Sequence, residues 1–120
     1  MQIARLSRKA LLKLLSGDVA EDGICVIKFY SSGCHLCHAL KDTYEEIAGD
    51  YDDLHFFAFN VQDDPKISKV LKFDGVPNIS MFKIKKGKKT QIKKITEPKD
   101  PHKVTWYTAQ DIRNFIEKEK

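Results

Sequence analysis

The sequence predicts an α/β fold in which a central mixed β-sheet is flanked by helices on both faces. The apolar run over 24–30 is short and rich in β-branched residues, which is typical of a strand buried inside a sheet. Segments with helical and with strand periodicity follow in the order helix, strand, helix, strand, helix, strand, strand, helix. At 120 residues the chain is expected to form one domain over 1–120.

The first half of the chain is expected to supply two helices and the strand that follows the second one. Ser7 is a suitable N-cap and Gly17 a suitable stop for a helix over 7–16, where leucines recur at helical spacing. A second helix is expected from Cys34 to about Gly49. The apolar and aromatic stretch 54–61 then predicts a strand.

The second half is expected to add a helix, a hairpin and a last helix. Pro65 follows two aspartates, which favours a helix start, and Gly87 marks a tight turn. Thr108 and Asp111 resemble a capping box. The predicted elements are, in order, a helix over 65–73, strands over 79–84 and 90–95, a polar loop over 97–106 and a helix from 108.

Composition and charge narrow the cellular setting. No apolar run approaches the roughly 20 residues that span a bilayer, so we expect no membrane partner. The segment 1–16 carries four basic residues and no acid, which also fits an organellar transit peptide, but its helical spacing favours a folded helix. We therefore expect a cytoplasmic protein. The net charge of +4 comes mostly from lysines concentrated between Lys83 and Lys103.

The three cysteines indicate redox or metal chemistry, because two of them lie only three positions apart. Cys34 follows the buried strand and opens a helix, where free amide groups and the helix dipole favour a thiolate. We assign Cys34 as the nucleophile and Cys37 as the resolving thiol, one helical turn away. Cys25 stands alone in the strand and is expected to be a buried packing residue.

Two histidines accompany the pair. His35 lies between the cysteines and His38 follows them, with Leu36 as the other intervening residue. A protonated imidazole there would stabilise thiolate and make the disulfide more oxidising. Two exposed histidines with little effect are an equally good interpretation.

Two metal-binding alternatives use the same residues. The string from Cys34 to His38 fits the pattern of c-type haem attachment, with His38 as the axial ligand. A zinc site would take both cysteines, His38 and a distant His55 or His102. The surrounding strand and helix order argues against haem, and the absence of a second close cysteine pair in the sequence argues against zinc. We expect no cofactor and no metal.

Three sequence features together resemble the thioredoxin family over nearly the whole chain. They are the strand Val26 to Tyr30, the pair in Cys34-His35-Leu36-Cys37, and Gly75-Val76-Pro77 further along. The resemblance implies a thioredoxin-like fold and a thiol–disulfide oxidoreductase acting on protein disulfides or dithiols, with a thioredoxin reductase or an equivalent electron donor. It also implies that Pro77 is cis and faces the pair, and that Gly33, Val76 and Pro77 bind the substrate.

The chain departs from the family at the active site itself. The family usually reads Trp-Cys-Gly-Pro-Cys, whereas this chain has Gly33 before the pair and His35 and Leu36 inside it. The family's proline in the active-site helix aligns with Asp42, so we expect a straighter helix.

A second departure lies beneath the pair. The buried aspartate of many thioredoxins aligns with Lys28, and its lysine partner aligns with Ala58. Either the Lys28 ammonium lies under the active site and modulates the thiols, or its stem packs inward and its head snorkels to solvent. We expect snorkelling.

A different class of function uses the lysine-rich segment from Lys83 to Lys94. A redox-inert binding module would keep the fold and hold an anionic protein or nucleic acid through this hairpin. Few aromatic residues interrupt its charge, so we do not expect nucleic acid. A solvated sheet edge that resists aggregation is the simpler interpretation.

Overall fold

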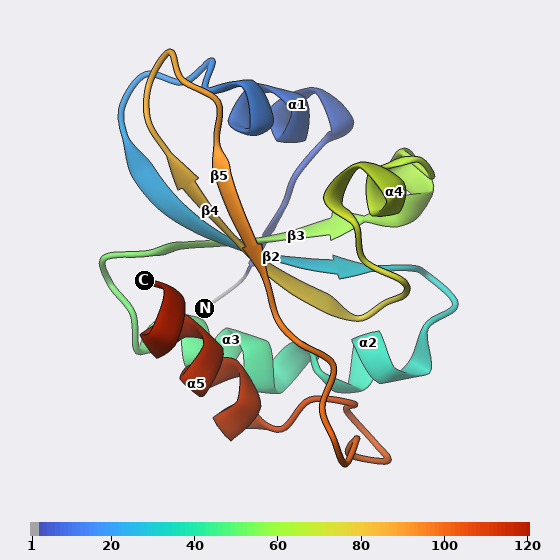
Figure 1. The fold of residues 1–120 in the computed structure, drawn as a ribbon. Helices are drawn as coiled ribbons and strands as arrows, with labels where there is room; N and C mark the ends of the chain where they lie inside the picture. Colours follow the sequence, from blue (N-terminus) through green and yellow to red (C-terminus); the bar gives the residue numbers. More distant parts are fainter. Residues whose placement is uncertain (1–2) are drawn as a thin grey trace.

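A computed structural model describes residues 3–120. Met1 and Gln2, which open the basic N-terminal segment, lie outside the described residues. Within residues 3–120, five strands form one sheet in the order β1-β3-β2-β4-β5 (Figure 1). Strands β1, β3 and β2 are parallel to one another, and β4 is antiparallel to both of its neighbours, β2 and β5. The strands are β1 Ala4–Arg5, β2 Gly23–Tyr30, β3 His55–Asn60, β4 Asn78–Ile84 and β5 Gln91–Lys94.

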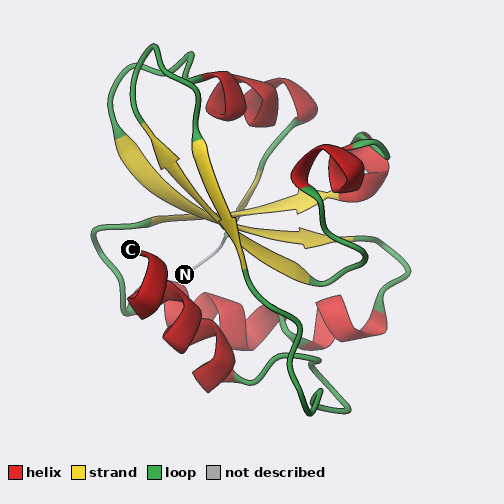
Figure 2. Cartoon of the chain, in the orientation of Figure 1, coloured by secondary structure: helices red, strands yellow, loops and turns green. Residues whose placement is uncertain are grey.

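Helices cover both faces of this sheet, as predicted from the sequence. Helices α1 and α4 lie on one face, whereas α2, α3 and α5 lie on the other (Figures 1 and 2). The helices are α1 Arg8–Ser16, α2 His35–Ala39, α3 Lys41–Gly49, α4 Ile67–Leu71 and α5 Ala109–Glu119. Within the described residues, no helix is long and apolar enough to cross a membrane.

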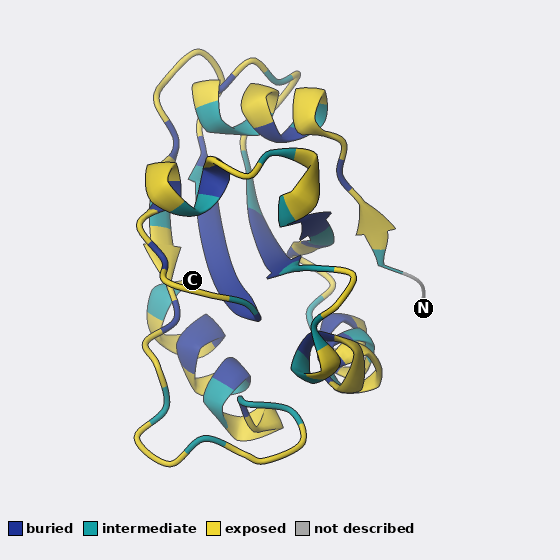
Figure 3. Cartoon of the chain, turned by 90° about the vertical axis from the view of Figure 1, so that its right-hand side faces the viewer, coloured by how far each residue is buried: buried dark blue, intermediate teal, exposed yellow. Residues whose placement is uncertain are grey.

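Two apolar clusters fill the spaces between the sheet and its helices. Successive side chains of a strand point to opposite faces, so Val26 joins the cluster beneath α3 and α5 while Ile27 joins the cluster beneath α1 and α4. The central strands β2 and β4 are accordingly buried along most of their length (Figure 3). Strand β2 is therefore a fixed support for whatever follows its last residue, Tyr30.

The helix ends that the sequence predicted from local capping residues are confirmed for α1 and α5. The Ser7 side chain accepts a hydrogen bond from the Ala10 amide at 3.1 Å, and Gly17 ends α1 with a φ of 77°. Thr108 and Asp111 form the predicted capping box of α5. Leu11 of α1 is fully buried, so the basic N-terminal segment contributes a packed helix.

The predicted straight active-site helix is wrong. The helix expected over 34–49 is divided at Leu40 into α2 and α3. Leu40 has a φ of −77° and a ψ of −13°, at the margin of the helical region, and its side chain is fully buried. Anchoring of this side chain in the core accompanies the break, although no proline lies there.

Two other elements differ from the sequence prediction. The two-residue strand β1 was not predicted, because it is too short to show alternation. The helix expected over 65–73 is only α4, since Asp64 bonds the Lys66 amide in a local turn instead of capping a helix. Lys72 then ends α4 with a φ of 60°.

Candidate redox site

The candidate site lies where the chain leaves β2 and enters α2. Cys34 is the N-cap residue of α2, and its sulfur forms a disulfide with Cys37 across a Cα–Cα separation of 5.2 Å. The Cys37 amide donates a hydrogen bond to Cys34 Sγ at 3.0 Å. The first sulfur therefore lies at a helix N-terminus, where backbone amides and the dipole stabilise negative charge.

The two sulfurs differ in access. Cys37 is only 1% exposed, whereas Cys34 is partly accessible. The carbonyl oxygen of Val76 lies 3.9 Å from Cys34 Sγ, so the loop before β4 faces the more open sulfur. The Val76–Pro77 peptide bond is cis, the isomer that the resemblance implied. Pro77 itself is buried and Val76 is half-buried, leaving the Val76 backbone beside the pair.

The loop 31–33 before Cys34 is held by polar contacts with the end of β3, with the 3-10 turn Val61–Asp63 that follows it, and with α2. Asn60, the last residue of β3, donates from Nδ2 to Ser32 Oγ at 3.0 Å, and Gln62 Oε1 accepts from the Ser32 amide at 3.1 Å. His38 Nε2 lies 2.8 Å from the Ser32 carbonyl oxygen. These contacts fix the backbone that presents Cys34.

Asn60 and Gln62 were missed at the level of sequence. The only available signal was a polar pair at the end of a strand adjacent to β2, and such pairs are common at strand ends. The residues predicted to flank the pair differ in their exposure to solvent. Gly33 and His35 are exposed and Leu36 is half-buried, whereas His38 is engaged with the Ser32 carbonyl.

Lys28 does not snorkel to solvent, so that expectation is wrong. Lys28 is 7% exposed, and its Nζ lies 5.3 Å from the ring centroid of Tyr44 and 5.9 Å from that of Tyr30. The aromatic faces hold the ammonium through cation–π contact inside the protein. Lys28 also lines a cavity of about 260 Å³ together with Cys37 and His38.

The charge of Lys28 is set by a balance of its surroundings. Burial lowers the pKa of the Lys28 ammonium, the carboxylate of Glu45 opposes this shift, and the neighbouring Lys41 adds to it. Glu45 and Lys41 line the same cavity. The cavity therefore brings a weakly solvated amine to the buried side of the cysteine pair, where many thioredoxins have a carboxylate.

Cys25 has the packing role predicted for it. It is free, 5% exposed, and burial raises the pKa of its thiol to about 11. A thiol that is so weakly acidic and so inaccessible is a poor nucleophile near neutral pH.

The zinc alternative does not assemble. Among residues 3–120, no group of three or more histidine, cysteine, aspartate or glutamate side chains is placed to hold a metal ion. The haem alternative requires both sulfurs to be free for thioether bonds, whereas here they are joined to each other in a disulfide.

A mixed sheet with helices on both faces, and a Cys-x-x-Cys pair at the helix after its central strand, define a thioredoxin-like protein. The family model for thioredoxin matches residues 12–108. The chain belongs to the thioredoxin family.

Solved structures share the fold at low sequence identity. Mitochondrial thioredoxin 3 from Saccharomyces cerevisiae, in its oxidized form, is 20% identical with a TM-score of 0.69, over 97% of this chain and 94% of that chain. A structure from work on thiol resolution in a yeast mitochondrial 1-Cys peroxiredoxin is 19% identical with a TM-score of 0.69, over 98% and 95%. Chloroplastic thioredoxin z is 18% identical with a TM-score of 0.66, over 98% and 94%. Comparison with curated protein sequences finds no match.

Proposed function

We propose that this protein is a thiol–disulfide oxidoreductase that acts on protein substrates through Cys34 and Cys37. The observation that carries the proposal is the asymmetry of the two sulfurs. Cys34 is partly accessible at the start of a helix, whereas Cys37 is 1% exposed and lies one turn behind it. A nucleophile must reach a substrate, and a resolving thiol needs to reach only the nucleophile.

In the reducing direction, the Cys34 thiolate attacks one sulfur of a substrate disulfide. A Cys34–substrate bond forms, the substrate S–S bond breaks, and the other substrate sulfur leaves as a thiolate. Cys37 then gives its proton to His38 or to water and attacks Cys34, which releases the second substrate thiolate and forms the disulfide seen here. Two electrons pass from the protein to the substrate, and a thioredoxin reductase or an equivalent donor restores the dithiol.

Substrate binding is assigned to the surface around Cys34. A side chain at Gly33 would meet no atom within 4 Å, so the approach on that side is open. The Val76 backbone offers an edge to an extended substrate segment, with Pro77 buried behind it. We propose the cytoplasm as the compartment, because a dithiol reductant works where thiols are kept reduced.

Lys28 is proposed as a modulating residue for Cys37. No carboxylate stands at its position to take the Cys37 proton during resolution. The Lys28 ammonium instead lines the cavity that Cys37 also lines, where its positive charge stabilises the thiolate that Cys37 becomes on losing its proton. The ammonium cannot accept that proton, and His38, which borders the same cavity, is the side chain proposed to take it.

Reduction of insulin by dithiothreitol, followed by turbidity, tests the activity. We expect Cys34→Ser to abolish turnover, and Cys37→Ser to trap mixed disulfides that release their partners only on reduction. Cys25→Ser is the matched control and should retain turnover, because its thiol is buried away from the pair. Turnover that survives Cys34→Ser would refute the assignment, and absence of turnover in the unaltered protein would favour the redox-inert binding module.

A further inference from the structure

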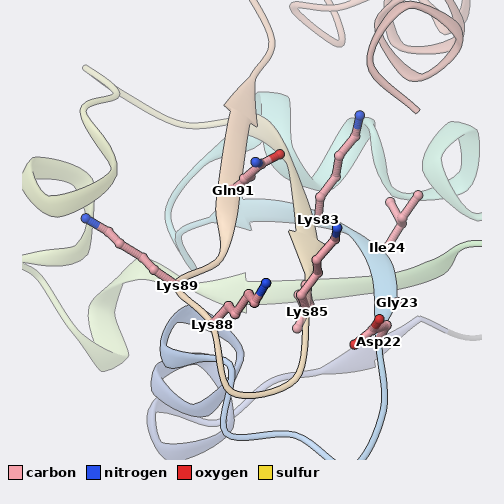
Figure 4. A pocket seen from close by; sticks show the side chains of 9 residues that line it. Asp22, Gly23, Ile24, Lys83, Lys85, Lys88, Lys89 and Gln91 are labelled. Carbon is pink, nitrogen blue, oxygen red and sulfur yellow. The ribbon is translucent and has the colours of Figure 1, made fainter.

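A second surface lies at the opposite end of β2 from the redox pair. A cavity of about 590 Å³ opens over the start of β2 and the end of β4 (Figure 4). We call it the lysine groove; Lys83, Lys85, Lys88 and Lys89 line it together with Ile24 and Ile84, among others. Most of strand β2 and the loop 31–33 separate this groove from Cys34, and the eight residues of β2 span about 25 Å at the rise of a β-strand.

The groove is an uncovered part of the sheet. Ile24 pairs with Lys83 across β2 and β4, and Lys83 pairs with Gln91 across β4 and β5, so the three side chains share one face. That face is the one covered by α3 and α5 further along, since Ile24 packs against the same cluster as Val26. Neither helix is among the elements that line the groove.

The positive charge of the groove is unneutralised within the described part of the chain. None of its four lysines takes part in an ion pair there. Asp22 is the one acid that lines the groove, and its Oδ1 already accepts a hydrogen bond from the Lys86 amide at 2.8 Å. An anionic partner would meet several free ammonium groups at once.

The lysines project from a fixed backbone. The turn at Gly87 donates its amide to the Gly17 carbonyl at 2.9 Å, and the Lys86 amide is held by Asp22. Thr90 Oγ1 also donates to the Leu14 carbonyl. The β4–β5 hairpin is thus fastened to the end of α1, which reduces the ordering that a partner would otherwise have to impose.

Protection of a sheet edge does not explain this arrangement. Lysines on β5 serve that purpose, because β5 is the edge strand. Lys83 lies on β4, which is paired on both sides, and Figure 4 shows the side chains of Lys83, Lys85 and Lys88 on one side of the hairpin, whereas Lys89 points away from them. Lys83 on this interior strand and the turn lysines after it thus surround a cavity that includes the partly exposed Ile24, an arrangement suited to an anionic partner.

We infer that the lysine groove binds an acidic protein segment that also carries apolar side chains. The carboxylates would meet the lysines, and the apolar side chains would cover the partly exposed Ile24. Nucleic acid fits less well, since the described residues that line the groove include no aromatic side chain on which a base would stack. The site is independent of the redox pair and of its activity.

Fluorescence anisotropy with labelled probes tests the inference on the full-length protein. The first probe is a twelve-residue peptide of glutamates and leucines. The others are an all-glutamate peptide, a version of the first with lysines in place of the glutamates, and a single-stranded DNA with the same net charge as the first peptide. We expect the glutamate–leucine peptide to bind most tightly, the all-glutamate peptide more weakly, and the lysine peptide not at all. Absent binding of the first probe, or tighter binding of the DNA, would overturn the inference.

Matched variants locate the binding site. Changing the four groove lysines to glutamine should weaken binding of the glutamate–leucine peptide by about tenfold or more, because several modest charge contacts are lost together. The control carries the same loss of charge on exposed lysines elsewhere, K66Q/K69Q/K99Q/K103Q, and should change affinity less than about twofold. Equal weakening in both variants would show a response to net charge only and would refute the groove. Insulin reduction by the groove variant is expected to stay unchanged.

Discussion

Replacing Lys28 by methionine removes a buried charge while keeping most of the apolar stem. Lys28 and Cys37 line the same cavity, so we take a charge separation on the order of 8 Å for an order-of-magnitude estimate. At an effective dielectric constant of about 20, a unit charge at this distance stabilises a thiolate by about 2 kcal/mol. This energy corresponds to about 1.5 pKa units and, for a two-electron couple, to about 40 mV.

The sign of the effect follows from which form carries the charge. A nearby ammonium stabilises thiolate and hence the reduced protein, so the unaltered pair is the more oxidising one. We expect Lys28→Met to raise the thiol pKa of the reduced pair and to make its potential more reducing, by up to the amounts above. Ultraviolet thiolate absorbance and equilibration with glutathione buffers measure the two quantities.

Two variants control this experiment. Lys28→Arg keeps a cation and should retain most of the potential, although the bulkier head group fits less well. Lys41→Met removes an exposed lysine from the rim of the same cavity and should have a much smaller effect, because solvent screens its charge. An unchanged thiol pKa and potential in Lys28→Met would refute the role of Lys28.

The remaining predictions concern the other thiols, a turn and a buried hydroxyl. Brief iodoacetamide treatment of the reduced protein at neutral pH should label Cys34 before Cys37 or Cys25, as read by peptide mass mapping; the reverse order would contradict the assignment. Gly17→Ala should lower the free energy of unfolding by at least about 2 kcal/mol, because φ is 77° and a Cβ would lie 2.1 Å from a backbone oxygen of the β4–β5 hairpin; an unchanged urea midpoint would show that the hairpin moves freely. Tyr44→Phe should lower the free energy of unfolding by about 1 kcal/mol, since the buried Tyr44 hydroxyl donates to strand carbonyls at 2.8 and 3.0 Å. An unchanged melting temperature would show that these hydrogen bonds do not contribute to stability.

Features that depend on neighbouring residues in the chain were open to prediction. The capping of α1 by Ser7, the capping box at Thr108 and the placement of Cys34 at a helix start are all local, and the structure agrees with them. The α/β fold followed from the order of periodic segments, because each strand or helix signals its type through a few successive residues.

Features that depend on packing between distant elements were not open to prediction. Lys28 looked able to snorkel because a strand residue alone does not show whether α2 and α3 close over it. The contacts of Asn60 and Gln62 with Ser32 arise only when β3 lies beside β2. The division of the helix at the buried Leu40 likewise has no proline or glycine in the sequence to indicate it.

Both candidate sites lie at the ends of the same strand, and this placement limits how they can work together. A partner segment in the lysine groove leaves Cys34 open, because β2 holds the two about 25 Å apart. Binding in the groove would therefore raise the local concentration of a disulfide in the same partner only where the connecting chain spans that distance, about eight extended residues. A shorter connection would hold the disulfide away from Cys34. Linked substrates with connectors on either side of this length thus separate recruitment through the groove from simple attraction by charge, since only recruitment depends on length.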